Sequence, residues 1–465
     1  MEPRSLGYVA TACAGDLRDG AHEALVHRVC TDSRQAQPGD LFFALAGERF
    51  DGHDYLPQAV AKGVGAVVAE RSRLPAGKCG CPVIAVESTR QALGRLAARY
   101  REDFSLPVVA VGGSNGKTTT KELVAAVLRQ QFPTLWSEAS FNNDIGVPLT
   151  LLRLDSSHRA AVLEVGSNHP GELAPLVQII RPNYGIITSI GREHLEFFGD
   201  LAGVAREEGW LAELLPVNGR LLVNGDSEWA SLLAKRTRAQ AVRVGLGAGN
   251  DWRARDLCSD ERGIRFLAEG PRADFAGEYR IRLLGRHQVV NALFAIAMGA
   301  ELGMEREAVA QGLAKCQPLK MRLELWEAGG LSVLDDSYNA NADSMEAALQ
   351  TLQELPCKGR RVAVLGDMAE LGAYSSTAHE EAGRRVAELG IGQLFAIGTM
   401  APIMARAARE AGLHRVFEFA DVETAAAAVG SFVKSGDLVL LKASRAARLE
   451  RIGDRLRNRP AAKGN

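Results

Sequence analysis

The residues with the clearest chemical potential lie in a glycine-rich segment, 107–122, which reads PVVAVGGSNGKTTTKE. A short β-branched run precedes the glycines, and an apolar helical pattern through Leu123 and Val127 follows them. A strand, a glycine turn and a helix in this order bring backbone N–H groups, the positive end of a helix and a lysine to one anion. We therefore predict a phosphate-binding loop formed by Gly112, Gly113, Ser114, Asn115, Gly116, Lys117 and Thr118.

Within this loop, Lys117 is expected on the phosphates and the Thr118 hydroxyl on Mg²⁺. The match to the general pattern is incomplete, because Val111 stands where the outer glycine is expected. The alternative is a glycine turn that only caps a helix. The apolar strand before the loop and the helix after it favour the phosphate loop.

Two polar residues follow apolar segments further along the chain, Glu164 after 160–163 and His194 after 184–188. Strands and helices alternate over 107–315, which predicts a mainly parallel, doubly wound sheet. Such sheets bind ligands beyond the carboxyl ends of their strands. We therefore expect Glu164 and His194 to face the phosphates and to hold Mg²⁺, which prefers oxygen ligands. The alternative for each is an ordinary solvated side chain at a strand end.

The last third of the chain repeats the alternating pattern and predicts a second Rossmann-like domain without its own phosphate loop. Its polar clusters at 335–341, 366–372 and 442–445 each follow a predicted strand, so they would form the second wall of a cleft. Between the two alternating regions, 253–283 is expected to form an antiparallel annex. The predicted strands of the last domain are 331–334, 361–365, 394–397 and 438–441.

The first hundred residues carry two polar turns beside predicted strands. Ser33 and Arg34 lie in one turn, and Gly47, Asp51 and His53 lie in or near the other. An arginine, hydroxyls and backbone amides beside a glycine-rich loop suit an anion such as a diphosphate. Two ordinary polar turns are the alternative, and spacing alone slightly favours it.

Composition bounds the possible classes of protein. At 465 residues the chain is expected to form about three domains, which we place at 1–106, 107–315 and 316–465. The net charge of −1 gives no sign of a nucleic-acid or membrane partner. Its seven cysteines include no C-x-x-C pair, so neither a zinc site nor a thioredoxin-type site is indicated. With no long apolar segment, the chain is predicted to be cytoplasmic with reduced thiols.

Five motifs resemble those of the ATP-dependent Mur ligases of peptidoglycan synthesis. GSNGKTTTKE resembles the nucleotide loop of the family, VLEVGSNHPGE its second metal motif, and TDSR with GDLFFAL and DGH its N-terminal domain. DDSYNANADSM and LGDMAELG are typical of the branch that adds D-alanyl-D-alanine to UDP-N-acetylmuramoyl-tripeptide, and the DNPR motif of the diaminopimelate-adding branch is absent.

The resemblance implies an α/β protein with three domains: one for the UDP-sugar, a central ATPase domain and a closing Rossmann-like domain. It also implies an acyl-phosphate reaction that uses ATP and Mg²⁺, and a monomeric protein. Matched motif by motif, Ser33, Arg34, Asp51 and His53 would lie near the UDP end. Lys117, Glu164, His194, Arg322 and Asp336 would be catalytic, with Asn143 (or Asn142), His287, Asn291, Arg322 and Asp336 near ATP. Asn339, Asn341, Asp367 and Glu370 would lie near the peptide ends.

Several positions depart from the family pattern. Gly112 replaces a usual threonine, Ser189 a common asparagine, Met321 a glycine and Ala342 a proline. Glu208 stands where many members carry a carbamylated lysine that holds the second magnesium. We hypothesise that Glu208 supplies this carboxylate directly. A solvated helix glutamate is the alternative, since Glu207 lies beside it.

Two other functions compete with this reading. Another amide ligase, such as a folylpolyglutamate synthase or the diaminopimelate-adding enzyme, is disfavoured by the GDLFFAL and DGH segments and by the missing DNPR motif. A P-loop switch protein that regulates a partner is disfavoured by the polar strand ends outside the ATP site. The sequence does not indicate the third residue of the tripeptide, the general base, the degree of domain closure or the oligomeric state.

Overall fold

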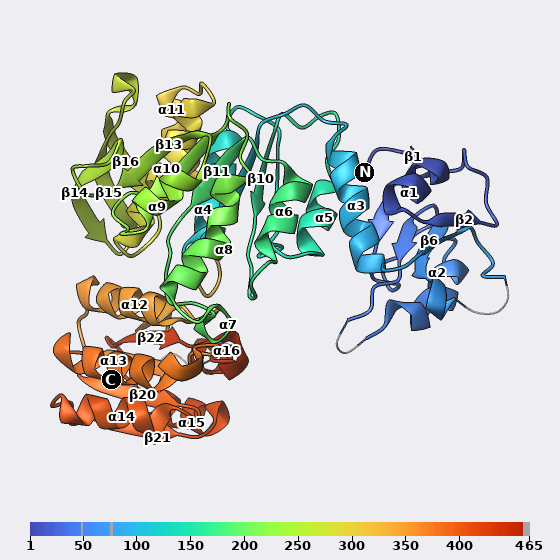
Figure 1. Ribbon diagram of the computed structural model, residues 1–465. Coiled ribbons are helices and arrows are strands. Elements are labelled where there is room, and N and C mark those ends of the chain that lie inside the picture. The colour runs from blue at the N-terminus through green and yellow to red at the C-terminus, as the bar shows by residue number, and fades with distance from the viewer. Residues whose placement is uncertain (48–49, 75–77, 459–465) are drawn as a thin grey trace.

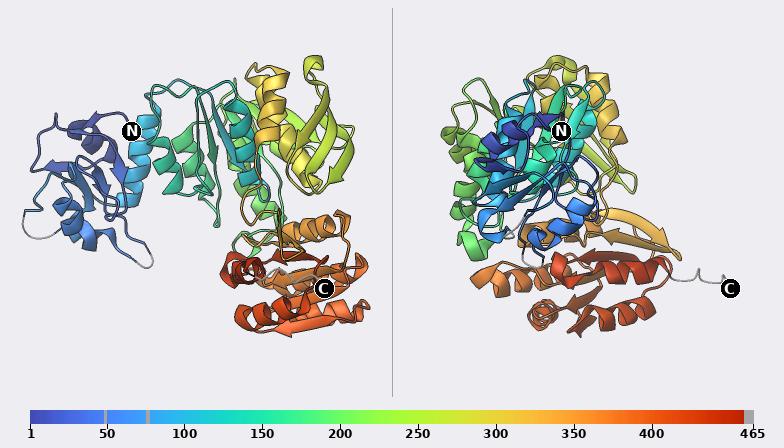
Figure 2. Two further views of the ribbon diagram at one scale, coloured as in Figure 1. Left: turned by 180° about the vertical axis from the view of Figure 1, so that it is seen from behind. Right: turned by 90° about the vertical axis from the view of Figure 1, so that its right-hand side faces the viewer.

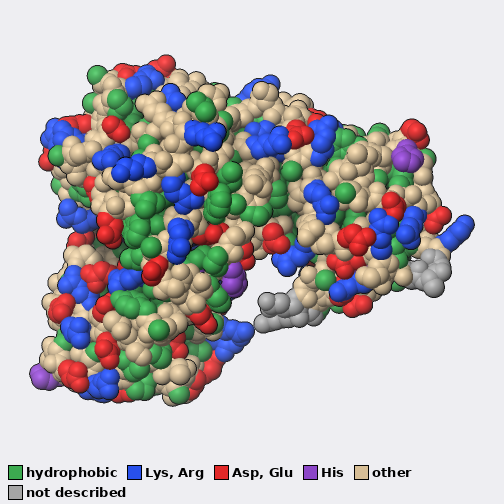
Figure 3. All heavy atoms as spheres, viewed as in Figure 1, with side chains coloured by type: hydrophobic (Ala, Val, Ile, Leu, Met, Phe, Trp, Pro, Cys, Tyr) green, Lys and Arg blue, Asp and Glu red, His purple; other side chains and the backbone are tan. Residues whose placement is uncertain are grey.

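The computed structural model describes residues 1–47, 50–74 and 78–458. Figures 1 and 2 show a central unit with the N-terminal unit against one of its ends and the C-terminal unit along another side. In Figure 1 and in the left view of Figure 2 the N-terminal and C-terminal units lie apart, and Figure 3 shows an open space between them. The described part of the chain therefore begins and ends in different units, with the central unit between them.

The N-terminal unit is built on a five-stranded sheet of order β2-β7-β6-β5-β4, in which only β2 runs antiparallel to its neighbour. Its core strands are short and apolar apart from Glu70 at the end of β6, as is typical of buried parallel strands. A separate two-stranded sheet pairs β1 with β3. The elements are β1 (Arg4–Ser5), α1 (Leu6–Cys13), β2 (Asp16–Arg18), β3 (Leu25–Val26), β4 (Val29–Cys30), β5 (Leu41–Phe43), α2 (Leu56–Ala61), β6 (Ala66–Glu70), β7 (Val83–Val86) and α3 (Thr89–Arg101).

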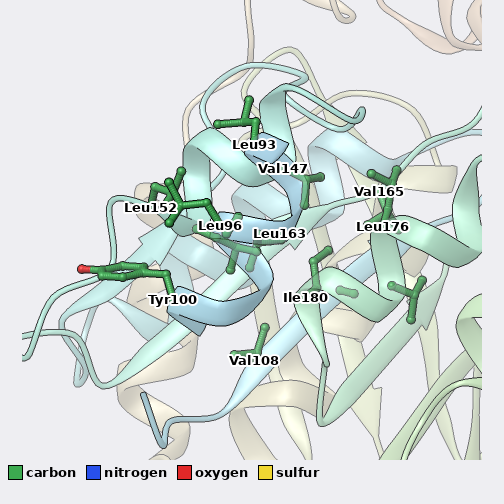
Figure 4. Close-up of a cluster of buried hydrophobic side chains, with 14 of the residues drawn as sticks. Leu93, Leu96, Tyr100, Val108, Val147, Leu152, Leu163, Val165, Leu176 and Ile180 are labelled. Carbon is green, nitrogen blue, oxygen red and sulfur yellow. The ribbon is translucent and has the colours of Figure 1, made fainter. Parts of the chain in front are cut away.

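Helix α3 joins the N-terminal unit to the central one through a shared hydrophobic core. Leu93, Leu96 and Tyr100 of α3 pack with Val147, Leu163 and other buried side chains of the central unit (Figure 4). The hydroxyl of Tyr100 also donates to the carbonyl oxygen of Leu154 at 2.6 Å. The first two units are therefore held together by packing, and the boundary at 106/107 stays a prediction.

The central unit contains a nine-stranded sheet of order β16-β15-β14-β13-β12-β11-β8-β10-β9. The strands from β9 to β13 run parallel, and β14, β15 and β16 form the antiparallel annex that the sequence predicts. The strands are β8 (Val108–Gly112), β9 (Thr134–Trp136), β10 (Ala160–Glu164), β11 (Tyr184–Ile187), β12 (Arg220–Asn224), β13 (Gln240–Gly245), β14 (Trp252–Asp260), β15 (Gly263–Glu269) and β16 (Gly277–Ile281).

Helices cover both faces of this sheet, which confirms the doubly wound arrangement. One face is covered by α4 (Lys117–Leu128), α10 (His287–Glu301) and α11 (Arg306–Lys315). The other is covered by α5 (Gly146–Leu151), α6 (Leu173–Ile180), α8 (Leu201–Glu213) and α9 (Ala230–Arg236), with α7 (Leu195–Phe198) beyond the sheet edge. Strand β8 lies between β10 and β11, so the chain turns to opposite sides of the sheet at β8. A ligand site is expected at that switch point.

The C-terminal unit is a six-stranded sheet of order β17-β18-β22-β19-β20-β21, parallel except for β17. Its strands are β17 (Glu324–Ala328), β18 (Leu331–Asp335), β19 (Arg361–Gly366), β20 (Gln393–Ile397), β21 (Val416–Phe419) and β22 (Leu438–Lys442). Helices α12 (Ala342–Glu354), α13 (Ser375–Glu388) and α14 (Ala401–Glu410) cover one face, and α15 (Val422–Phe432) and α16 (Glu450–Arg457) the other.

The Rossmann-like form of this unit confirms the predicted fold class, although the sequence did not indicate β17 and β21. Both are edge strands whose residues are mostly half-exposed and include glutamates, so their apolar signal is weak. The boundary at 315/316 also stays a prediction. No helix within the described residues is long and apolar enough to cross a membrane.

Candidate active site

The phosphate loop lies at the switch point of the central sheet, between the end of β8 and the start of α4. Gly113 and Gly116 adopt positive φ angles of 110° and 88°, which glycine tolerates best. A Cβ at residue 113 would also lie 2.5 Å from the hydroxyl oxygen of Thr188. Helix α4 begins without a side-chain cap, so the amides of its first turn remain for a ligand. This geometry suits a bound phosphate.

Lys117 lies inside the loop beside several carboxylates. Its Nζ donates to the carbonyl oxygens of Gly113 and Ser114 at 2.5 and 3.0 Å and forms an ion pair with Glu193 at 3.3 Å. Burial by itself would lower the pKa of Lys117, but Glu193, Glu208 and Glu164 outweigh it and raise that pKa. The lysine is therefore held in its charged form.

Glu193 is a site residue that the sequence prediction missed. Burial raises the pKa of its carboxyl group to about 7, against the opposing effect of Lys117. Its position next to His194 was the only available signal, since a single glutamate in a loop has no pattern of its own. In the structure it forms an ion pair with Lys117.

Glu164 ends β10 beside the loop and is buried. Its Oε1 accepts from Asn142 Nδ2 at 2.9 Å, while its Oε2 is buried without a hydrogen-bond partner. An unpaired buried carboxylate oxygen is costly unless a cation or donor joins it. The residues present therefore fit Mg²⁺, which is usually held by one or two carboxylates together with phosphates and water.

The asparagine beside Glu164 is Asn142, not Asn143. The Asn143 side chain instead accepts from the amides of Ile145 and Gly146 at 3.2 and 2.9 Å, at the start of α5. Two adjacent asparagines look equivalent in sequence, and only the helix that begins at Gly146 distinguishes them. Of the two asparagines left open by the sequence, Asn142 is thus the one bonded to Glu164, and the role of either at the phosphates stays a prediction.

Glu208 is buried in α8 and its Oε2 accepts from the Gly113 amide at 2.6 Å. Burial raises the pKa of this carboxyl group. Glu207, next to it, accepts instead from the amides of Gly171 and Leu173, before and at the start of α6. Glu208 is therefore not a solvated helix residue, and its carboxylate reaches the phosphate loop.

His194 lies on the side of the site that faces the C-terminal unit, where its Nδ1 contacts the Glu370 carboxylate. Burial lowers the pKa of His194, although Glu370 opposes this effect. Among the side chains that the structure describes, no three or more His, Cys, Asp and Glu groups form a metal-binding cluster. Glu164, His194 and Glu208 are thus not gathered into one preformed set.

The C-terminal unit contacts the phosphate loop directly. Asn341 caps α12 and its Nδ2 donates to Asn115 Oδ1 at 2.9 Å. Tyr338 contacts Ser140 of the central unit, hydroxyl to hydroxyl, at 2.6 Å, and the Arg322 guanidinium lies 4.3 Å from the Tyr338 ring centre. The predicted second wall of the cleft is therefore in place.

Asp336 is held by Lys442, which lies in the predicted cluster 442–445 but was given no individual role. Lys442 is buried at the end of β22 and its Nζ donates to Asp336 Oδ2 and to the Asn339 carbonyl. The Asp336 Oδ1 accepts from the Leu323 amide at 3.1 Å, so Asp336 also orders the chain beside Arg322. A lysine that ends an otherwise apolar strand was the available signal.

Asp367 has a structural role in this geometry. Its two oxygens accept from the amides of Thr399 and Met400 at 2.8 and 3.0 Å, before α14. Both oxygens of this carboxylate therefore have backbone partners, and the assignment of Asp367 to the peptide ends stays a prediction. The side chain of Glu370 is engaged with His194, as described above.

Two of the residues predicted near ATP, His287 and Asn291, lie at the start of α10. A Cβ at Gly116 would lie 2.8 Å from Asn291 Oδ1, so Asn291 rests on the phosphate loop. Its Nδ2 donates to Gln288 Oε1 at 2.8 Å, and His287 is exposed next to Gln288. Gln288 and Arg322 also line one small pocket. The start of α10 and Arg322, both predicted near ATP, are therefore brought together at this pocket.

The N-terminal candidates form a group of their own, away from the phosphate loop. Asp51 accepts from His53 Nδ1 at 2.6 Å, and His53 Nε2 accepts from the Glu70 amide at 3.0 Å. Ser33 donates to a neighbouring glutamine at 2.5 Å. Arg34 is exposed and pairs with Asp32 next to it, and the Gly47 amide donates to the Phe50 carbonyl. The structure thus leaves Arg34 the most available cation of this group.

A phosphate loop at a switch point, faced by a second α/β unit, defines a P-loop enzyme with an interdomain site. Three family descriptions match the chain: "Mur ligase family, catalytic domain" over 25–101, "Mur ligase middle domain" over 111–299 and "Mur ligase, glutamate ligase domain" over 321–445.

Relatives and solved structures of similar length agree. The UDP-N-acetylmuramoyl-tripeptide--D-alanyl-D-alanine ligases of Bacillus subtilis and Escherichia coli are 36% and 38% identical, over 97% and 91% of this chain and 98% and 92% of theirs. MurF from Acinetobacter baumannii superposes with a TM-score of 0.90 at 32% identity, covering 99% of this chain and 100% of that one. Thermotoga maritima MurF in complex with ADP gives 0.81 at 27%, covering 92% and 97%. The chain belongs to the Mur ligase family, in its group of UDP-N-acetylmuramoyl-tripeptide--D-alanyl-D-alanine ligases.

Proposed function

We propose that this chain joins D-Ala-D-Ala to UDP-MurNAc-tripeptide at the expense of ATP, giving UDP-MurNAc-pentapeptide, ADP and phosphate. The observation that carries the proposal is the contact of Asn341 with Asn115, which brings the C-terminal unit against the phosphate loop. A site assembled from two units suits a reaction with three substrates better than nucleotide hydrolysis alone. The relatives named for this reaction match over nearly the whole chain.

The chemistry needs an activated carboxyl group, because a peptide carboxylate is a poor electrophile. The γ-phosphoryl group of ATP passes to that carboxylate and forms an acyl phosphate. The amine of D-Ala-D-Ala then attacks the acyl carbon, phosphate leaves, and the amine loses a proton. Lys117 holds the transferring phosphoryl group in this scheme, where fixed positive charge stabilises the transition state.

We assign the site residues to three parts of the substrates: ATP, the UDP end and the peptide ends. We place Gly112, Gly113, Ser114, Asn115, Gly116, Lys117 and Thr118 on the ATP phosphates, and His287, Asn291, Arg322 and Asp336 around the rest of ATP. Ser33, Arg34, Gly47, Asp51 and His53 are assigned to the UDP end, and Asn339, Asn341, Asp367 and Glu370 to the peptide ends.

Mg²⁺, when bound, would neutralise charge on the phosphates. We assign three groups to this ion: the Thr118 hydroxyl, the unpaired Oε2 of Glu164 and the carboxylate of Glu208. We assign His194 to it as a further ligand, although in this structure His194 contacts Glu370. We further propose that the chain acts as a cytoplasmic monomer with domain boundaries near 106/107 and 315/316. Closure of the C-terminal unit then excludes water from the acyl phosphate.

The test is phosphate release from MgATP with UDP-MurNAc-tripeptide and D-Ala-D-Ala added singly and together. Release that needs both substrates, together with a pentapeptide product detected by mass spectrometry, is the expected result. Release that ignores both would leave a bare ATPase and would overturn the proposal. Running the assay with the lysine and the diaminopimelate tripeptides identifies the third residue.

A further inference from the structure

Arg192 carries the densest set of contacts between the central and C-terminal units. Its Nε donates to Asp343 Oδ1 at 2.7 Å, and its backbone amide donates to Asp343 Oδ2 at 2.7 Å. Its Nη1 donates to the Tyr374 hydroxyl at 2.6 Å and to Glu381 at 2.9 Å. One side chain of the central unit therefore contacts both α12 and α13, of which α12 lies against the central unit in Figure 1.

The loop that carries Arg192 is also bonded to the phosphate loop. The Ser114 amide donates to the Ser189 carbonyl at 2.8 Å, and the Gly191 amide donates to the Ser114 hydroxyl at 2.8 Å. Glu193 follows Arg192 and pairs with Lys117. The segment 189–193 thus contacts the nucleotide site on one side and the C-terminal unit on the other.

Gly191 permits this close approach of the two units. A Cβ at residue 191 would lie 2.5 Å from Asp343 Oδ2, although the φ angle of Gly191 is not in the positive range. An alanine there would keep the backbone conformation and displace the carboxylate that Arg192 binds. The glycine at 191 therefore leaves space for the Asp343 carboxylate and is not required by the backbone conformation.

We propose that Arg192 is a positioning residue that holds the C-terminal unit against the nucleotide site. The proposal rests on the proposed ligase function and adds to it the side chain that sets domain docking. A planar guanidinium is suited to this task because it donates in several fixed directions at once. Through Asp343, Arg192 also fixes the start of α12, where Asn341 reaches Asn115. Loss of Arg192 would loosen docking while leaving every phosphate-binding group in place.

The experiment compares full-length Arg192→Ala and Gly191→Ala with a matched control, Arg385→Ala. Arg385 bonds Glu346 at 2.7 Å and thereby joins α13 to α12 within the C-terminal unit, and its side chain is 32% exposed against 28% for Arg192. Small-angle X-ray scattering of each protein, alone and with MgADP, gives the radius of gyration. Steady-state assays give kcat and KM for ATP and for D-Ala-D-Ala.

We expect Arg192→Ala and Gly191→Ala to enlarge the radius of gyration of the free protein, and Arg385→Ala to leave it unchanged. The first two should lower kcat/KM for D-Ala-D-Ala about tenfold, as the loss of one networked contact does. Asp343→Asn combined with Arg192→Ala should be no worse than Arg192→Ala alone, because both remove the same contact.

An unchanged radius of gyration in Arg192→Ala overturns the proposal, even if turnover falls. Fully additive effects of Arg192→Ala and Asp343→Asn also overturn it. A wild-type protein that forms no pentapeptide would refute the proposed function instead, and the scattering comparison would still decide the docking role of Arg192.

Discussion

Glu208 Oε2 lies 2.6 Å from the amide nitrogen of Gly113, inside the phosphate loop. A buried carboxyl group thus contacts the phosphate loop through a backbone amide, although burial raises its pKa. Its neighbour Gly112 leaves room for it, because a Cβ at residue 112 would lie 2.9 Å from the same oxygen. Two departures from the family pattern, Gly112 and Glu208, are therefore in direct contact.

The first prediction concerns the charge of Glu208. Because the carboxylate is part of the side chain, depletion of bicarbonate should leave wild-type activity unchanged. Glu208→Gln keeps an acceptor for the Gly113 amide but removes the charge, so it should raise the Mg²⁺ concentration needed for ADP binding by about tenfold or more. Isothermal titration with ADP over a magnesium series measures this without turnover.

Glu207→Gln is the matched control for Glu208→Gln. Glu207 is next in sequence and as deeply buried, at 5% against 3% exposure, but it binds the amides at the start of α6. It should leave the magnesium requirement unchanged. Equal shifts in both variants would assign the effect to general loosening of α8.

The second prediction concerns Gly112. Gly112→Ala should displace the Glu208 carboxylate and lower the free energy of unfolding by about 1–3 kcal/mol, the usual effect of overpacking. The same change in a Glu208→Ala background should have a much smaller effect, since the clashing atoms are gone. Thermal denaturation of the four proteins completes the cycle. Gly249→Ala, where no atom lies within 4 Å, controls for the glycine replacement itself. Additive effects would contradict the predicted contact.

The order of residue types along the sequence predicted those parts of the candidate site that lie within or directly after a single strand. The phosphate loop was predicted because an apolar strand, glycines and a helix occur in a fixed order, and Glu164 because it follows an apolar strand. Parallel strands then place their carboxyl ends at one edge of the sheet. The position of β8 between β10 and β11 confirms that reasoning.

The rest depends on partners that are distant in sequence. Glu193 and Arg192 acquire their roles only when Lys117 and Asp343 are brought to them, and Lys442 only beside Asp336. For the same reason the partners of Asp367 were not predicted, because the backbone amides that it binds belong to a loop more than thirty residues away. No spacing rule along the chain reports such pairs.

A third prediction tests the joint between the first two units. Tyr100 is fully buried, and its hydroxyl donates to Leu154 O and accepts from the Glu2 amide at 2.7 Å. Tyr100→Phe leaves both groups unpaired and should destabilise the protein by about 1–3 kcal/mol. Scanning calorimetry should show this in the transition of the N-terminal and central units. Tyr8→Phe, whose hydroxyl bonds Asp103 near the surface, should change stability little. Similar losses of stability in Tyr100→Phe and Tyr8→Phe would contradict a specific role of the Tyr100 hydroxyl in joining the two units.

The last prediction uses two buried aspartates of the C-terminal unit with opposite pKa shifts. Burial raises the pKa of Asp335 above 3.8, and Ser337 and Arg457 offset this only in part. Burial also acts to raise the pKa of Asp437, but hydrogen bonds from Arg360 and the Lys434 amide outweigh it and lower that pKa. The folded protein therefore binds the Asp335 proton more tightly than the unfolded chain does, and the Asp437 proton less tightly.

These signs predict opposite effects of amide substitution. The stability that Asp335 contributes is present at low pH and is lost as pH rises through its raised pKa. Asp335→Asn should therefore gain stability relative to wild type as the pH rises from about 4 to neutrality, because the unfolded aspartate titrates near 3.8. The contribution of Asp437 is present above that value and is lost as pH falls through its lowered pKa. Asp437→Asn should therefore be least stable, relative to wild type, at neutral pH. Urea denaturation of the three proteins across this pH range measures both differences, and a common sign would refute the assignment of the two shifts.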